Sequence, residues 1–143
     1  MTRRYYEHLP KGITHNDLHA DNVMVDDTDN SKDPQPTIID FGRALPFGRR
    51  LFPRPLAFYE RFPYLDPYLS FEQGLTSPAS DVYSFAYLVT NMKEYKDCPH
   101  LKKLLDKAKN SDPSKRSALD EFVWILKLVQ KIYLLWGKEW PTT

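Results

Sequence analysis

The chain has 143 residues, which is enough for one domain with a hydrophobic core. Its net charge of +1 at pH 7 excludes the strong overall field that draws proteins to nucleic acid or to anionic membranes. Cys98 is the only cysteine, so an intrachain disulfide is excluded, and neither a secretory signal nor a membrane-spanning stretch is visible. These features predict a cytoplasmic protein.

The first predicted elements lead into a polar loop. Residues 2–9 have the composition of the last turns of a helix, which Pro10-Lys11-Gly12 ends. Ile13 then begins a short extended piece, and residues 15–22 follow it as a loop. The chain therefore enters this loop from a strand.

A β-hairpin with a long polar tip is expected next. Residues 23–25 (Val-Met-Val) and 37–39 (Thr-Ile-Ile) are short strand-forming runs, and residues 26–36 between them are polar and rich in turn formers. In a hairpin the first residue of one strand lies beside the last residue of the other. The open end of this hairpin is therefore expected to bring Asn22 and Asp40 close together.

Residues 42–67 are predicted to form an irregular loop, because they contain seven prolines or glycines. From Arg43 to Arg61 this segment carries five arginines and one acid, a local balance of +4. Two interpretations stay open: the arginines hold an acidic partner, or they form a solvated basic loop.

Amphipathic helices are predicted in the second half of the chain. One begins at Ser77-Pro78, which supply an N-cap and a proline at the first helical position. Its apolar residues recur at helical spacing at Val82, Phe85, Ala86, Val89 and Met92. Residues 99–109 form the next helix, with an inward face of Leu101, Leu104, Leu105 and Ala108.

Asp112-Pro113 breaks the chain before the last predicted helix. Ser117 and Asp120 suit a capping box with a shorter acid, and the helix runs to about Trp136, where Gly137 is a favourable C-cap. The inward face of this helix consists of Phe122, Ile125, Leu126, Val129, Ile132, Tyr133 and Trp136.

Two short motifs carry the chemistry. Residues 15–22 read H-x-D-x-x-x-x-N, and Asp40-Phe41-Gly42 follows the second strand of the hairpin. The first motif places the Asp17 carboxylate five residues before the Asn22 amide, and the second motif adds the Asp40 carboxylate. Mg²⁺ binds few protein oxygens alongside phosphate oxygens, and phosphoryl transfer depends mostly on positioning and charge neutralisation. Together the motifs predict a phosphoryl-transfer site.

The chain resembles the C-terminal lobe of eukaryotic protein kinases over nearly all of its length, and looks most like the divergent members with H-N-D in place of H-R-D. The other landmarks are Asp66-Pro67-Tyr68 at the family's Ala-Pro-Glu, Ser80-Asp81-Val82-Tyr83-Ser84-Phe85 at a helix start, and Asp112-Pro113-Ser114-Lys115-Arg116. The resemblance implies one mainly α (α+β) domain, 1–143, without the N-terminal lobe. Its parts would be the catalytic loop 13–25, the D-F-G and activation segment 40–69 and the helical subdomain 77–137.

The resemblance also implies catalytic roles. Asp17 would be the base that accepts or orients the proton of the attacking hydroxyl. Asn22 and Asp40 would be the magnesium ligands and would contact the phosphates of ATP.

Three further residues would be structural supports. In the family His15 supports the loop from beneath, Asp81 braces it by accepting backbone N–H bonds, and Arg116 pairs with the glutamate of Ala-Pro-Glu. Tyr68 replaces that glutamate here, so Glu72 is the nearest acid in sequence for Arg116.

Two residues depart from the protein-kinase pattern. His19, expected to contact the nucleotide, stands where protein-serine kinases have a lysine, and a neutral imidazole neutralises less phosphate charge. Leu18-His19 instead resembles the small-molecule phosphotransferases, which carry H-G-D-L-H-x-x-N. Asn16 replaces the arginine that pairs with an activation-segment phosphate, which argues against that switch.

The expected function is ATP- and Mg²⁺-dependent phosphoryl transfer to a protein hydroxyl, carried out by a complete two-lobed parent protein. Whether the chain is a fragment of such a protein or a free-standing lobe stays open. The alternatives are an inactive pseudokinase-like interaction module and a small-molecule phosphotransferase. The chain contains no glycine-rich phosphate loop or strand lysine before residue 15, so it is expected to bind ATP weakly and to be inactive alone. The expected partners are a protein substrate or partner protein and a second copy of the chain, joined through the cleft face at Val23, Val25, Ile38 and Phe41. Neither nucleic acid nor a membrane is expected as a partner.

Overall fold

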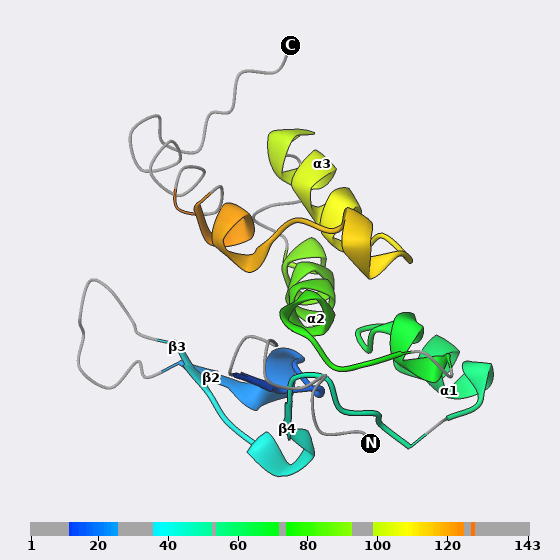
Figure 1. Cartoon of the computed structure of the whole chain (residues 1–143). Coiled ribbons are helices and arrows are strands. Elements are labelled where there is room, and N and C mark those ends of the chain that lie inside the picture. The colour runs from blue at the N-terminus through cyan, green and yellow to red at the C-terminus, as the bar shows by residue number, and fades with distance from the viewer. Residues whose placement is uncertain are drawn as a thin grey trace.

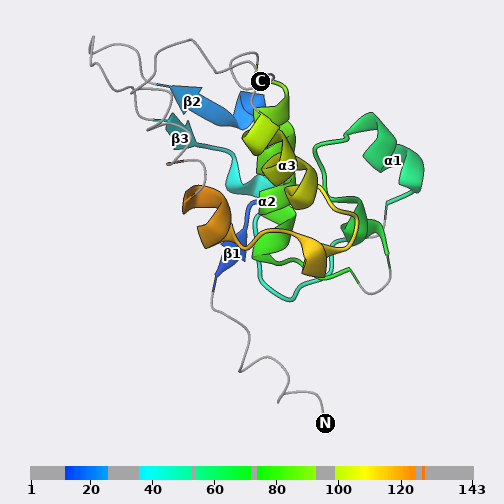
Figure 2. The ribbon, with the colours of Figure 1, turned by 90° about the horizontal axis from the view of Figure 1, so that it is seen from above.

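The computed structural model describes residues 12–25, 36–52, 54–71, 74–92, 99–124 and 127. Strands β1 (Ile13–Thr14), β2 (Val23–Val25), β3 (Pro36–Ile38) and β4 (Leu45–Pro46) precede helices α1 (Leu56–Arg61), α2 (Pro78–Thr90) and α3 (Pro99–Ala108). Helix α2 lies between α3 and the strands (Figure 1), and the β2–β3 hairpin and α1 lie on opposite sides of α2 when seen from above (Figure 2). The predicted mainly α (α+β) class is confirmed.

The hydrophobic core lies between α2 and α3. Helix α2 begins after Ser77 with Pro78 in its first turn, as predicted, and an apolar stripe of each helix packs against the other. Met92 was expected on this stripe, but α2 ends at Thr90 and the Met92 side chain is 43% exposed. The buried cluster consists of Val82, Ala86, Val89, Leu101, Leu104, Leu105, Ala108 and Phe122.

Small antiparallel sheets hold the first half of the described chain. Strands β2 and β3 pair Val23 with Ile38 and Val25 with Pro36, so the predicted hairpin is confirmed, with β3 starting one residue earlier than expected. Strand β1 pairs with β4, where the Thr14 hydroxyl donates a hydrogen bond to the Leu45 carbonyl. No helix in the described residues is both long and apolar enough to cross a bilayer.

The prediction of an irregular loop over residues 42–67 is wrong in part, because it contains β4 and α1. Pro55 directly precedes α1, and residues 56–62 contain neither proline nor glycine. Tyr59 is buried, and the rings of Phe58 and Phe62, four residues apart on the helix, have centroids 4.9 Å apart. Tyr59 is the buried residue of α1, and four of its six residues are exposed, so the helix contacts the rest of the described chain mainly through Tyr59 and Phe58.

The predicted capping box at Ser117 is also wrong. Ser117 is buried, and its hydroxyl has no hydrogen-bond partner in the part of the chain that the structure describes. The helical turn starts at residue 119, and the Phe122 N–H donates to the Ala118 carbonyl. The helix ends predicted at residues 2–9 and at residues 136–137 lie outside the described residues.

Candidate active site

The loop that contains Asp17 is anchored to the first turn of α2. The Asp81 carboxylate accepts hydrogen bonds from the backbone N–H of His15 (2.8 Å) and of Asn16 (3.2 Å). Asn16 has a φ of 61°, in the left-handed region where asparagine is enriched. Its buried side-chain amide donates to the Arg43 carbonyl at 3.1 Å. The loop is therefore tied both to α2 and to the segment that follows D-F-G.

Asp81 also predicts a pH dependence of stability. Burial raises the pKa of its carboxyl group, and the hydrogen bonds from His15 and Asn16 oppose that rise. The folded state therefore holds the proton more tightly than the unfolded state. The contribution of this tighter proton binding to the free energy of unfolding is fully present below about pH 4. It is lost as the pH rises through the raised pKa of Asp81. Relative to Asp81→Asn, the wild-type free energy of unfolding is expected to fall over this window, as measured by urea denaturation.

The matched control is Asp112→Asn. Hydrogen bonds from Ser114 lower the pKa of the Asp112 carboxyl. The contribution of Asp112 to the free energy of unfolding therefore changes with pH in the opposite direction. It is present above about pH 4 and is lost as the pH falls through the lowered pKa. Parallel pH profiles for the wild type and Asp81→Asn would contradict burial as the dominant influence on Asp81.

His15 connects the loop to the D-F-G segment. Its buried Nε2 lies 2.9 Å from the Ile39 carbonyl, and its ring centroid lies 4.9 Å from that of Phe41. Because a carbonyl only accepts, Nε2 is the donor, and Nδ1 is left buried without a hydrogen-bond partner among the described residues. His15 therefore joins its own motif, residues 15–22, to the D-F-G segment.

Asn22 and Asp40 lie at the same end of the β2–β3 hairpin. The Ile39 N–H donates to the Asn22 carbonyl at 2.9 Å, so Asp40 is the next residue beyond the paired strands. The Asn22 Nδ2 donates to the Asp17 carbonyl at 2.9 Å, which leaves Oδ1 as the oxygen that can face a cation. Asp40 is exposed, has a φ of 59°, and accepts a hydrogen bond from the Gly42 N–H through Oδ1. The hairpin thus brings both oxygen donors to the loop of Asp17.

These residues fit a cation that is held by few protein oxygens. Mg²⁺ usually keeps several waters and binds one or two protein groups together with substrate phosphates. Asn22 offers Oδ1 for this purpose, and Asp40 offers Oδ2. Within the described residues no three histidine, cysteine, aspartate or glutamate side chains gather into a metal site. The donor set therefore suits a Mg²⁺–phosphate complex better than an ion held by protein alone.

Two side chains that the sequence analysis did not select contact the Asp17 carboxylate. Arg43 Nη1 lies 3.5 Å from Oδ1, and the Tyr64 hydroxyl donates to the same oxygen at 3.3 Å. His19 lies beside them, and its Nε2 accepts a hydrogen bond from the Asn22 amide at 3.2 Å. The position of Arg43 directly after D-F-G was a usable signal. Tyr64 is 47 residues from Asp17 and had no local signal.

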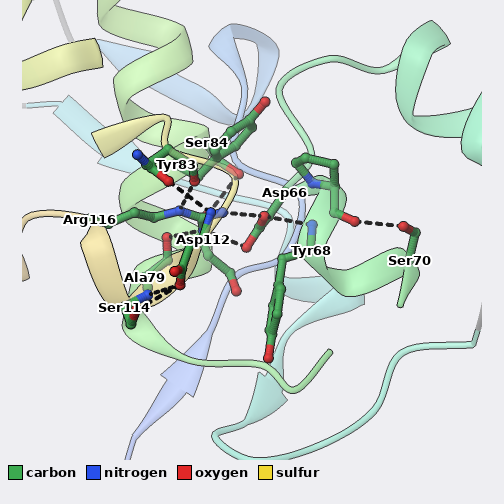
Figure 3. A network of polar contacts seen from close by, with 12 residues as sticks. Asp66, Tyr68, Ser70, Ala79, Tyr83, Ser84, Asp112, Ser114 and Arg116 are labelled. Atoms are coloured by element: carbon green, nitrogen blue, oxygen red, sulfur yellow. Dashed lines mark hydrogen bonds and ion pairs between the residues drawn. The ribbon is translucent and has the colours of Figure 1, made fainter. Parts of the chain in front are cut away.

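Arg116 pairs with Asp66, which corrects the expectation of Glu72. Its Nη1 and Nη2 donate to the two carboxylate oxygens of Asp66 at 2.6 Å and 2.7 Å. The Nε and Nη1 groups also donate to the carbonyls of Asn110 and Ala79 (Figure 3). In the family the acid that pairs with this arginine is the third residue of Ala-Pro-Glu. Here the acid is the first residue of Asp66-Pro67-Tyr68, so a comparison position by position did not find the partner of Arg116. Glu72 lies outside the described residues.

A hollow of about 300 Å³ lies beside the site on the arginine-rich segment. Its lining includes three arginines and two apolar residues, namely Arg43, Arg50, Arg54, Leu51 and Phe52. The Arg54 guanidinium also lies 5.3 Å from the centre of the Phe58 ring, a cation–π distance. An acidic partner in this hollow stays a prediction.

Comparison with known proteins bears on the chemistry of the site. A model of the phosphotransferase enzyme family matches residues 2–46, which include the loop at 15–22, the hairpin and D-F-G. No match was found among curated proteins. Over residues 2–46 the chain is therefore similar to phosphotransferases of the kinase-like superfamily, and phosphoryl transfer is the chemistry that the match supports.

Proposed function

We propose that the site serves ATP- and Mg²⁺-dependent phosphoryl transfer to a hydroxyl group of a protein. The observation that carries the proposal is the hydrogen bond from the Asn22 amide to the Asp17 carbonyl, together with the Ile39–Asn22 backbone pair that precedes Asp40. These contacts support one base and two cation ligands at the open end of one hairpin. The family match over residues 2–46 supports the same chemistry.

Each residue would have a separate task. The Asp17 carboxylate would accept or orient the proton of the attacking hydroxyl. Asn22 Oδ1 and the Asp40 carboxylate would hold Mg²⁺, which neutralises phosphate charge when it is bound. His19 would face the phosphates with less charge than a lysine provides. The fixed backbone around Asn16 would preserve the orientation of Asp17.

A protein acceptor is preferred because of features outside the matched stretch. Asp81 at the start of α2 resembles a protein-kinase feature in kind and place, and the buried Asp66–Arg116 pair resembles one in kind. The basic hollow offers a surface for acidic side chains of a protein.

A small-molecule phosphotransferase is the second candidate. Leu18-His19 matches the pattern of those enzymes and lies within the stretch that the family model covers. Its acceptor would be a small hydroxylated compound rather than a side chain. The pseudokinase-like module, the third interpretation, requires no turnover at all.

The deciding experiment incubates the chain, both alone and within a longer protein that supplies an N-terminal lobe, with γ-labelled ATP and Mg²⁺. Peptides that contain serine, threonine or tyrosine form one arm, and a panel of sugars and amino alcohols forms the other. Label on peptides supports the proposal, and label on small alcohols supports the second candidate. No transfer in either arm, from a two-lobed protein that circular dichroism shows to be folded, would favour the interaction module.

The affinity for nucleotide is expected to be low. The 143 residues contain no glycine-rich loop or strand lysine before the catalytic loop, and the acids of the site cannot replace those contacts with phosphate. Calorimetric titration with ATP and Mg²⁺ should give a dissociation constant well above about 1 μM, which corresponds to about 8 kcal/mol. Sub-micromolar binding would contradict this expectation.

We further propose self-association through the open face of the hairpin. Val25, Ile38 and Phe41 are exposed there, whereas Val23, expected on the same surface, is half-buried. Exposed apolar side chains gathered in one area are typical of interfaces, and a symmetric dimer covers such an area at once on both copies.

A further inference from the structure

Tyr64 places a hydroxyl group on the carboxylate that the proposed reaction assigns as base. Its hydroxyl donates to Asp17 Oδ1 at 3.3 Å. Its ring lies against the His19 ring, with centroids 4.7 Å apart and planes tilted by 41°. One side chain therefore contacts both the base and the residue expected beside the phosphates.

The surroundings keep this hydroxyl protonated. Burial raises the pKa of the Tyr64 hydroxyl, and the charge and hydrogen bond of Asp17 raise it further, whereas Arg43 opposes the shift. The group that faces Asp17 is thus a neutral O–H, the same group that a hydroxyl substrate presents to a base.

Tyr64 is held in place from both sides of the chain. The Leu65 N–H donates to the Phe62 carbonyl, and the Tyr83 hydroxyl of α2 donates to the Pro63 carbonyl at 3.4 Å. Leu65 is buried, and the next residue is Asp66, anchored by Arg116. The position of the ring is therefore a consequence of the packed segment and not of a free side chain.

We propose that Tyr64 occupies the acceptor subsite as an internal stand-in for the substrate hydroxyl, so that an external acceptor must displace it from Asp17. The proposal rests on the proposed function in one respect, the assignment of Asp17 as base. It makes Tyr64 a residue that limits access to the site. It also predicts that the subsite accepts a phenol-sized or smaller hydroxyl once the Tyr64 ring is removed.

Binding to a vacated subsite tests the occupancy directly, without turnover. Tyr64→Ala should bind p-cresol, with shifts in the NMR signals of the His19 ring, and should bind toluene at least about tenfold more weakly, because toluene cannot donate to Asp17. Wild type, in which the Tyr64 hydroxyl holds Asp17, should bind neither, and Tyr64→Phe, which keeps the ring but not the hydroxyl, should bind p-cresol more weakly than Tyr64→Ala. Equal binding of p-cresol and toluene, or p-cresol binding to wild type at the same site, would overturn the proposal.

Kinetics supply a second test that does not depend on the alanine variant. Tyr64→Phe removes the competing hydroxyl and should lower KM for an external hydroxyl acceptor by about tenfold, the effect of one hydrogen bond to a charged group. The control Tyr87→Phe, which removes the hydroxyl of a tyrosine in α2, should leave KM unchanged. An unchanged KM in Tyr64→Phe would overturn the inference and leave the proposed function intact. Binding of p-cresol to Tyr64→Ala, together with no transfer by any variant within a two-lobed protein, would support the occupancy and remove the proposed function.

Discussion

Arg116→Ala is expected to lower the free energy of unfolding by about 3–5 kcal/mol. The Arg116 and Asp66 side chains are 0% and 1% exposed, and two hydrogen bonds of 2.6 Å and 2.7 Å join them. Removal of the guanidinium leaves the Asp66 carboxylate buried without its counter-charge, which is the expensive half of a broken buried ion pair. Urea denaturation followed by circular dichroism measures the loss.

The controls separate the buried charge from the lost contacts. Lys107→Ala breaks an exposed ion pair with Glu121 and should cost no more than about 1 kcal/mol. The double variant Arg116→Met with Asp66→Leu removes both charges and should be more stable than Arg116→Ala. Equal stability of Arg116→Ala and the wild type would show that the Asp66 pair does not hold the segment before α2 in place.

Asp17→Asn is expected to lower the rate of the proposed transfer by about 100-fold to 10,000-fold. An amide has nearly the shape of the carboxylate but cannot accept the proton of the attacking hydroxyl. The Asn22 amide bonds to the backbone carbonyl of Asp17 and not to its side chain, so the substitution leaves that contact in place. Single-turnover measurements with labelled ATP determine the rate.

Asp40→Asn should abolish the same transfer by a different route. Its loss removes a negative ligand of Mg²⁺, so more Mg²⁺ should be required for any remaining rate, whereas Asp17→Asn should leave the Mg²⁺ requirement unchanged. Asp21→Asn, on the same loop with a side chain that is 94% exposed, is the charge-matched control and should retain activity. Retained turnover in Asp17→Asn would remove that residue from the role of base.

Several elements could be predicted because they depend on neighbours in the chain. Helices α2 and α3 were visible in the spacing of their apolar residues, and proline after serine marked the start of α2. The hairpin was visible as two strand-forming runs around a polar tip. Its pairing places Asn22 and Asp40 at one end, so the sequence alone predicted that these two residues lie close together.

Tertiary structure alone decided which side chains contact Asp17 and Arg116. Arg43 and Tyr64 reach the Asp17 carboxylate, and Asp66 takes the place of Glu72 beside Arg116, across 26, 47 and 50 residues of chain. Helix α1 lies within a segment rich in proline and glycine and buries Tyr59, and Ser117 is buried instead of capping a helix. The spacing of residue types predicts helix faces, strand faces and turns, because these depend on contacts between residues that are close together in the sequence. Partners far apart in sequence are set by how packed elements meet, and no local pattern carries that information.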